Sequence, residues 1–341
     1  MSQEIARKLM DKIHAEKKDW PKLDHLQTIC DPSIQLPAWA VGPFRRNEGL
    51  TFRKTAQWAD ESYRSHAIFN PALMEKDGKL YMYYRATPVM ESLESKVGLA
   101  VFNGEKWQDY AGNPVVDMET EAENLGVEDP KIYKANGQYY LFYNACCVYD
   151  PQGEAQTEFG DVAVDISVAT SQDLLHFTKK GPVVPAAVSR RCAKGAVVPR
   201  NGRGEAVKIN GEYLMLFNTG EDGRKIQLVG HSADFESWTF EERDFLDANY
   251  LHQLEEVACC VTEDDWDYFI LDVYHVMPDG EQRGTQVRYL KADPYTPLEY
   301  VTGATFSWGG LIKYRGSWTF AQGWEAQKGE ETMYLYTEMP K

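Results

Sequence analysis

Carboxylate side chains recur at matching places along this chain of 341 residues. Asp129 begins the phrase DPKIYKANGQYYLFYNA, Glu205 begins EAVKINGEYLMLFNT, and Glu256 begins EVACCVTEDDWDYFILDVYH. Cleavage of a glycosidic bond needs one acid to protonate the leaving oxygen and a second carboxylate to activate water or attack the sugar. Three carboxylates at one place would otherwise raise one another's pKa and cost stability. The pattern therefore indicates a glycoside-cleaving site.

A plainer interpretation applies to each position, because Asp and Glu also begin strands simply as turn residues. Asp129 stands out because Pro130 follows it, as Pro71 follows Asn70 at the matching place in an earlier copy of the phrase, NPALMEKDGKLYMYYRA. An Asx–Pro pair that occurs twice in register indicates a shaped backbone at these two positions. Asp129 is therefore the first candidate for a residue of this site.

The elements that position these residues belong to an internal repeat. Each copy has a short apolar segment, a turn with Gly or charged residues, and a second apolar, aromatic-rich strand. The copies begin at Asn70, Asp129, Glu205, Glu256 and Gly309. A period of about 50–75 residues with three or four strands is typical of propeller blades. The sequence predicts an all-β, five-bladed β-propeller over residues 41–341, with the five aligned positions at one mouth of a central channel.

The N-terminus differs from the rest of the chain. Ile5, Leu9 and Ile13 recur at helical spacing, which predicts an amphipathic helix over residues 3–17 that Pro21 ends. We expect residues 1–40 to form a helical extension. It either packs on the propeller or makes an oligomer contact, so a homo-oligomer stays open.

Composition excludes several functions. A net charge of −16 argues against nucleic acid and anionic membranes as partners. The chain has no long apolar run and no secretory signal pattern, so a membrane span is not expected. Two adjacent cysteine pairs, Cys146–Cys147 and Cys259–Cys260, lie in strand-like segments and predict reduced thiols in a cytoplasmic protein. No cofactor is expected and no spacing demands a metal, although an acidic channel is chemically able to hold Ca²⁺.

The blade phrases resemble glycoside hydrolase family 130, the family of β-mannoside phosphorylases and β-mannosidases. FNPALMEKDGKLYMYYRA and GVEDPKIYKANGQYYLFYNA look like its first two blades, and VKINGEYLMLFN and VYHV follow in order. Related propellers place a catalytic Asp at the start of the first blade, where this chain has Asn70. The resemblance implies that Asp129 is the general acid, acting through a sugar hydroxyl, and that Asn70 and Arg85 hold an oligosaccharide substrate.

The attacking species is a separate question, because the family includes phosphorolysis and hydrolysis. Phosphorylases carry basic residues in the third blade, where this chain has Ala206–Val207 and Asn218. Glu205 and Glu256 suit activation of water, so we expect an inverting β-mannosidase, with β-1,2-linked manno-oligosaccharides among its candidate substrates. His275 matches a phosphate-contacting histidine of the family, which keeps the phosphorylase open. A non-catalytic carbohydrate-binding propeller is the third alternative.

Three further residues are predicted to bind the substrate. Tyr143 lies in the second blade, near the predicted acid in the repeat. Trp324 and Glu325 follow the last copy of the repeat, where they could stack on a sugar and hydrogen-bond it. The same two residues could equally close the last blade.

Overall fold

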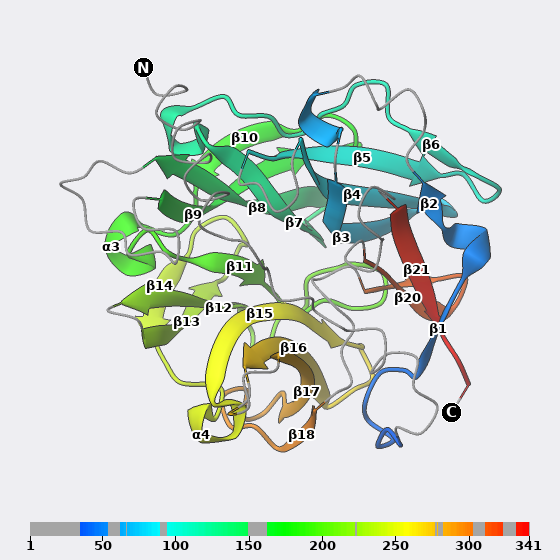
Figure 1. Cartoon of the computed structure of the whole chain (residues 1–341). Helices are drawn as coiled ribbons and strands as arrows, with labels where there is room; N and C mark the ends of the chain where they lie inside the picture. The colour runs from blue at the N-terminus through cyan, green and yellow to red at the C-terminus, as the bar shows by residue number, and fades with distance from the viewer. Residues whose placement is uncertain are drawn as a thin grey trace.

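The computed structural model describes residues 35–53, 62–65, 67–88, 94–148, 162–221, 224–276, 278, 282–302, 311–322 and 332–340. Within these residues the strands form five antiparallel sheets, which Figure 1 shows arranged in a ring. The prediction of an all-β, five-bladed propeller is confirmed. The predicted N-terminal helix and most of the predicted 1–40 extension lie outside the described residues.

Four blades each take four strands that follow one another in the chain. Blade 1 contains β3 (Ala67–Lys76), β4 (Lys79–Thr87), β5 (Lys96–Phe102) and β6 (Trp107–Asp109). Blade 2 contains β7 (Gly126–Ala135), β8 (Gln138–Val148), β9 (Val162–Ser171) and β10 (Thr178–Pro182). Blade 3 contains β11 (Lys194–Val197), β12 (Tyr213–Glu221), β13 (Arg224–Ser232) and β14 (Thr239–Glu242). Blade 4 contains β15 (Gln253–Thr262), β16 (Tyr268–Val276), β17 (Gln282–Leu290) and β18 (Glu299–Thr302).

Blade 5 joins the two ends of the described chain. It contains β19 (Ile312–Tyr314), β20 (Ser317–Gln322), β21 (Thr332–Glu338) and β1 (Phe44–Arg46), while β2 (Phe52–Arg53) also pairs with β21. The ring of Phe44 meets the edge of Phe320 at 4.8 Å, and the Arg46 guanidinium lies 4.0 Å above the ring of Tyr334. An early strand therefore completes the last blade and closes the ring, which the repeat pattern did not reveal.

Short helices connect some of the strands. They are η1 (Glu48–Leu50), η3 (Ser62–Arg64), η4 (Glu121–Glu123), α3 (Ala186–Ser189) and α4 (Ala248–Leu251). No helix within the described part of the chain has the length and apolar character needed to cross a membrane.

Tight turns fix the register of the first two hairpins. Asp77–Gly78 joins β3 to β4 and Asn136–Gly137 joins β7 to β8, and all four residues have positive φ. Two successive residues with positive φ match the twist of a two-residue hairpin, which favours Asn-Gly and Asp-Gly there. Because both hairpins turn at the same place in the repeat, Asn70 and Asp129 lie at the same end of their strands.

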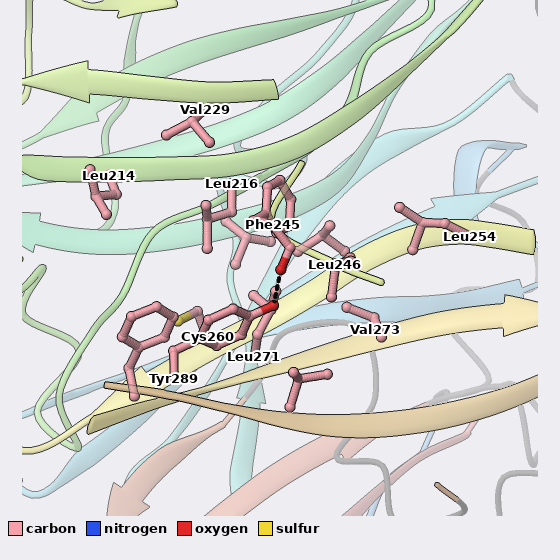
Figure 2. Close-up of a cluster of buried hydrophobic side chains, with 14 of the residues drawn as sticks. Leu214, Leu216, Val229, Phe245, Leu246, Leu254, Cys260, Leu271, Val273 and Tyr289 are labelled. Atoms are coloured by element: carbon pink, nitrogen blue, oxygen red, sulfur yellow. Dashed lines mark hydrogen bonds between the residues drawn. The ribbon is translucent and has the colours of Figure 1, made fainter. Parts of the chain in front are cut away.

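Apolar layers between blades hold the inner strands in position. Figure 2 shows the layer between blades 3 and 4, where Leu216 of β12 and Val229 of β13 lie in one buried cluster with Leu271 of β16. The Tyr289 hydroxyl donates to the carbonyl oxygen of Phe245 at 2.6 Å, so its one polar group is satisfied inside the layer. Burial of each large apolar side chain contributes about 1.5–3 kcal/mol, which makes such layers the main constraint on blade geometry.

Candidate active site

Asn70 and Asp129 occupy equivalent, irregular positions on the inner strands of blades 1 and 2. Their φ angles are 43° and 51°, in the left-handed region that non-glycine residues seldom adopt. The strand register breaks at both places, between Phe69 and Ala72 and between Glu128 and Lys131. Such a bulge re-aims a side chain that regular alternation would direct elsewhere. The repeated Asx–Pro pair therefore marks a backbone shape that brings Asn70 and Asp129 together.

The Asp129 carboxylate is held by side chains from three other strands. Asn70 Nδ2 donates to Oδ1 at 2.6 Å, and Arg85 Nη1 lies 3.3 Å from the same oxygen. Asn144 Nδ2, on β8, donates to Oδ2 at 3.5 Å. Asp129 is only 8% exposed, so these contacts set its orientation. An acid fixed in this way can present one oxygen in a constant direction.

Glu128 is a second buried carboxylate beside Asp129. Its Oε2 lies 2.6 Å from Nη2 of Arg85, so one guanidinium contacts both neighbouring carboxylates. Burial raises the pKa of Glu128 to about 7 against the attraction of Arg85, and the nearby Asp129 charge raises it further. Glu128 was missed in the sequence, because alternation along a regular strand directs adjacent residues to opposite faces.

Glu256 approaches this cluster from blade 4, next to a glycine of blade 3. A Cβ added to Gly195 would lie 2.9 Å from the carbonyl oxygen of Val257 and 3.3 Å from Glu256 Oε1. Gly195 has a φ of +72° and its N–H donates to Asn144 Oδ1 at 3.4 Å. Glycine is therefore required for the close approach of blades 2, 3 and 4. Glu256 is 8% exposed and interacts electrostatically with Glu128.

Two lysines add positive charge to the same end of the inner strands. Lys131 follows the bulge on β7 and donates from Nζ to the carbonyl oxygen of Ala258 at 2.9 Å. Lys194 begins β11, and its charge acts on Glu128. We call this cluster the site end of the propeller. Its members are Asn70, Arg85, Glu128, Asp129, Lys131, Asn144, Lys194, Gly195 and Glu256.

Glu205 does not belong to the site end, which corrects the predicted alignment of the repeats. The inner strand of blade 3 is β11, and Glu205 lies in the connection after it. Glu205 forms a bridge beside Lys134 and contacts Lys134 Nζ at 3.2 Å and Arg203 Nε at 3.0 Å. Lys134 is five residues beyond Asp129 on β7, roughly 16 Å at the usual strand rise. Glu205 therefore belongs to the opposite end of the inner strands.

Tyr143 and His275 are enclosed by other parts of the protein. The Tyr143 hydroxyl donates to Glu123 Oε1 at 2.7 Å, within the apolar layer between blades 1 and 2. His275 is fully buried, with Nδ1 2.9 Å from the Leu251 carbonyl oxygen and Nε2 2.7 Å from the Thr285 hydroxyl. Both predicted substrate contacts are therefore already occupied by internal hydrogen bonds.

Trp324 and Glu325 lie outside the described residues. Across the described ranges, no group of three or more His, Cys, Asp or Glu side chains is arranged to hold a metal ion. The five cysteines in those ranges are free thiols.

The opposite end is organised around Arg200, which follows β11. Arg200 Nη1 donates to the carbonyl oxygens of Leu73 at 3.2 Å and Ile132 at 2.9 Å, and Nη2 donates to that of Leu311. The backbone of Arg200 pairs with Cys260 and Thr262 on β15. One residue of blade 3 thus contacts the innermost segments of all four other blades. This contact holds the five blades together around the axis.

The chain matches the profile of a known protein family over the residues that form the site end. Residues 44–267 match the sequence profile of Glyco_hydro_130, described as beta-1,4-mannooligosaccharide phosphorylase. The match covers more than half of the chain and includes every member of the site end. The chain belongs to glycoside hydrolase family 130. The family resemblance inferred from the blade phrases is confirmed.

One curated protein is similar to this chain over part of its length. The 1,2-beta-oligomannan phosphorylase of Thermoanaerobacter sp. (strain X514) is 29% identical over 188 residues. The alignment covers 53% of this chain and 54% of that protein. The chain thus matches about half the length of this relative.

Solved structures share the propeller over nearly all of the family 130 chain. A structure from work on family 130 glycoside hydrolases that target beta-1,2 mannosidic linkages in Candida mannan has a TM-score of 0.65, at 18% identity and with 90% and 96% of the two chains covered. The beta-1,2-mannobiose phosphorylase from Listeria innocua gives 0.62 at 14% identity, with 86% and 96% covered. At these identities the likeness establishes the fold.

Proposed function

We propose that this chain is an inverting β-mannoside phosphorylase. Inorganic phosphate attacks the anomeric carbon, the bond from that carbon to the bridging oxygen breaks, and the departing oxygen takes a proton supplied by Asp129. Inversion at the anomeric carbon of a β-mannoside yields α-mannose 1-phosphate and a shortened sugar. The phosphorylase names of the family profile and of the curated relative support this choice over hydrolysis.

The charge balance of the site end carries the proposal. Arg85, Lys131 and Lys194 supply three positive charges beside the carboxylates of Glu128, Asp129 and Glu256. Burial raises the pKa of Glu128 to about 7, so one of these carboxylates is partly neutral near that pH. A phosphate dianion therefore meets a cluster that is neutral to slightly positive, and cationic donors are its natural partners. Glu205 adds no negative charge beside the phosphate, because it lies at the opposite end of the inner strands.

Hydrolysis is the second candidate, and Glu256 is the observation that favours it. Its carboxylate lies beside Gly195 at the site end and is able to act as a base toward water. An inverting glycosidase needs such a base on the face of the sugar opposite the acid.

Product formation with and without phosphate separates the two reactions. The purified protein is incubated with β-1,2-mannobiose and, separately, β-1,4-mannobiose, and the products are followed by phosphorus and proton NMR. We expect α-mannose 1-phosphate from at least one substrate and no turnover when phosphate is omitted. Equal release of mannose without phosphate would establish the hydrolase instead. Binding of both sugars with no product in either condition would leave a carbohydrate-binding propeller.

A further inference from the structure

Two stacked tyrosines lie on the outer side of blade 4, apart from the residues that the proposed reaction uses. Tyr250 of α4 stacks on Tyr300 of β18, with ring centroids 4.2 Å apart and an angle of 27° between the rings. Tyr250 is 42% exposed, and Leu298 is the other large apolar side chain that is exposed within the described ranges. We call Tyr250 and Tyr300 the aromatic pair.

Hydrogen bonds hold both rings of the aromatic pair in position. The Tyr250 hydroxyl lies 2.9 Å from Thr302 Oγ1, and the Tyr300 hydroxyl accepts from the N–H of Asp247 at 3.2 Å. The helix α4 is anchored by Leu251, which is 1% exposed and belongs to the apolar layer between blades 3 and 4. A single exposed apolar side chain needs no explanation. A ring fixed in this way, however, loses little conformational entropy when a ligand stacks on it.

The strand register places the aromatic pair at the level of the site end. One row of paired residues crosses blade 4 from β15 to β18 and contains Val257, Val273, Thr285 and Thr302. Val257 follows Glu256 in the chain, and Thr302 contacts Tyr250. Three steps between strands separate the ends of the row, roughly 14 Å at the usual spacing. Tyr250 therefore lies to the outside of the site end, where Figure 1 shows α4 at the edge of the ring.

Polar residues connect Tyr250 to the site end along the chain. Glu256 is six residues after Tyr250. Between them, His252 and Gln253 are exposed and Glu255 is half-buried, and Gln253 Nε2 donates to Glu255 Oε1 at 2.9 Å. A sugar chain presents apolar C–H faces that stack on aromatic rings and hydroxyls that hydrogen-bond to polar side chains. The surface from Tyr250 to Glu256 offers both kinds of contact.

We propose that the aromatic pair is a distal binding site for the manno-oligosaccharide substrate, with Tyr250 stacking on a sugar unit beyond those that lie at Asp129. This inference rests on the proposed function, because the ligand is the same class of sugar chain. A protein partner would need about 800 Å² of surface on each side. Two rings with one further exposed apolar side chain in the described ranges suit a smaller ligand. The site implies that long substrates are preferred over short ones.

The dependence of turnover on chain length tests the distal site. We would measure kcat/KM for mannobiose and mannohexaose, each with β-1,2 and with β-1,4 linkages, in the wild type, Tyr250→Ala and Tyr250→Phe. The wild type should favour the hexaose of the linkage it accepts. Tyr250→Ala should lower the ratio of hexaose to mannobiose kcat/KM about fivefold, as expected for the loss of one aromatic contact. Phe keeps the ring, so Tyr250→Phe should keep the ratio within about twofold.

The matched control is Leu298→Ala, which removes the other exposed apolar side chain. Leu298 is 50% exposed and directly precedes β18, on the side of Tyr300 away from Thr302. Its replacement should leave the ratio as in the wild type. A fall equal to that in Tyr250→Ala would overturn the proposal, because any loss of apolar surface would then have the same effect. A wild-type ratio close to one would overturn it without the use of any variant.

Other outcomes separate the distal site from the reaction. Absence of turnover of every substrate by the wild type would overturn the proposed function, whereas the distal site would then be tested by calorimetric titration with the two hexaoses. Equal hexaose affinity in the wild type and Tyr250→Ala would overturn the distal site. An equal loss of kcat/KM for short and long substrates in Tyr250→Ala would assign Tyr250 to the fold instead. A changed elution volume of Tyr250→Ala in size-exclusion chromatography would assign the aromatic pair to a contact between copies of the chain, which would also overturn the proposal.

Discussion

Arg85 and Arg200 are both buried near the centre of the propeller, at 7% and 2% exposure, but they have different partners. Arg85 is paired with the carboxylates of Glu128 and Asp129, and burial raises the pKa of Glu128 to about 7. The hydrogen bonds of the Arg200 guanidinium go to backbone carbonyl oxygens of three other blades. Carbonyl oxygens do not change charge with pH, so the contacts by which Arg200 holds the blades together do not depend on pH. The same inner strands thus carry ionisable side chains at the site end and contacts to backbone carbonyl oxygens around Arg200.

The contrast predicts opposite effects for the same change at the two ends. Arg200→Met should lower the free energy of unfolding by about 3 kcal/mol, because buried carbonyl oxygens lose their donor. Its kcat/KM, measured well below the unfolding temperature, should change little. Arg85→Met should instead lower kcat/KM by about 10²–10³-fold, because a preorganised cation is lost from the site. Urea unfolding and steady-state kinetics of both variants measure the split. Equal effects on both properties in both variants would remove the distinction between the two ends.

Two glycines extend the comparison, because both have a positive φ but only one is closely surrounded by other atoms. Gly195 has φ +72° with a backbone oxygen 2.9 Å from the position of an added Cβ, whereas Gly137 has φ +77° and open space there. Gly195→Ala should cost about 1–2 kcal/mol of stability and lower kcat/KM about tenfold by displacing Glu256. Gly137→Ala should show only the conformational cost, about 1 kcal/mol. Unchanged kinetics in Gly195→Ala would argue against the placement of Glu256.

Replacement of His275 distinguishes a role in the stability of the fold from the predicted role in substrate binding. Burial lowers the pKa of His275 below its usual 6.5, so the unfolded chain binds a proton that the folded chain does not. This contribution to stability is present above pH 6.5 and is lost as the pH falls below it. Unfolding free energies measured from pH 7.5 to 5 should therefore decline less in His275→Gln than in the wild type. A large rise in the KM for phosphate in this variant would instead restore its predicted role in substrate binding.

Glu205 should show the smallest effect. Its carboxylate is partly exposed and contacts Lys134 and Arg203 at the opposite end. Exposed ion pairs contribute up to about 1 kcal/mol, so Glu205→Gln should change stability by less than that. Its kcat/KM should stay within about twofold of the wild type. A loss of a hundredfold or more would return Glu205 to the catalytic residues predicted from the sequence.

The sequence predicted the blades well because each repeats the same turn and strand chemistry, as in the Asp77–Gly78 and Asn136–Gly137 hairpins. It failed in blade 3 because VKINGEY does form the hairpin turn, with Asn210 and Gly211 at positive φ, but the inner strand Lys194–Val197 is separated from that turn by an inserted segment. The segment between them carries Arg200 to the axis, a contact between distant parts of the chain that has no local signal. The closing strand Phe44–Arg46 was missed for the same reason.

Prediction of the site was correspondingly uneven. Asn70 and Asp129 share a recognisable signal, the Asx–Pro pair. Glu128 had none, because its orientation depends on the bulge that follows it. Asn144 and Gly195 contribute through register with neighbouring strands, which a single sequence does not reveal. The positive φ at Asp129 and the break in register after Glu128 turn the two adjacent carboxylates to one side. Both are features of the folded backbone, which residue types alone do not reveal.

The most direct test of the account is the turnover of a β-mannobiose, in the presence of phosphate, by the wild type and by Asp129→Asn. Loss of a general acid is expected to lower kcat/KM by about 10³-fold or more. The thermal unfolding midpoint of the variant should remain close to that of the wild type, since Asn is similar in shape and hydrogen-bonding capacity to Asp. Turnover by Asp129→Asn at the wild-type rate, with the fold intact, would contradict the placement of the reaction at the site end.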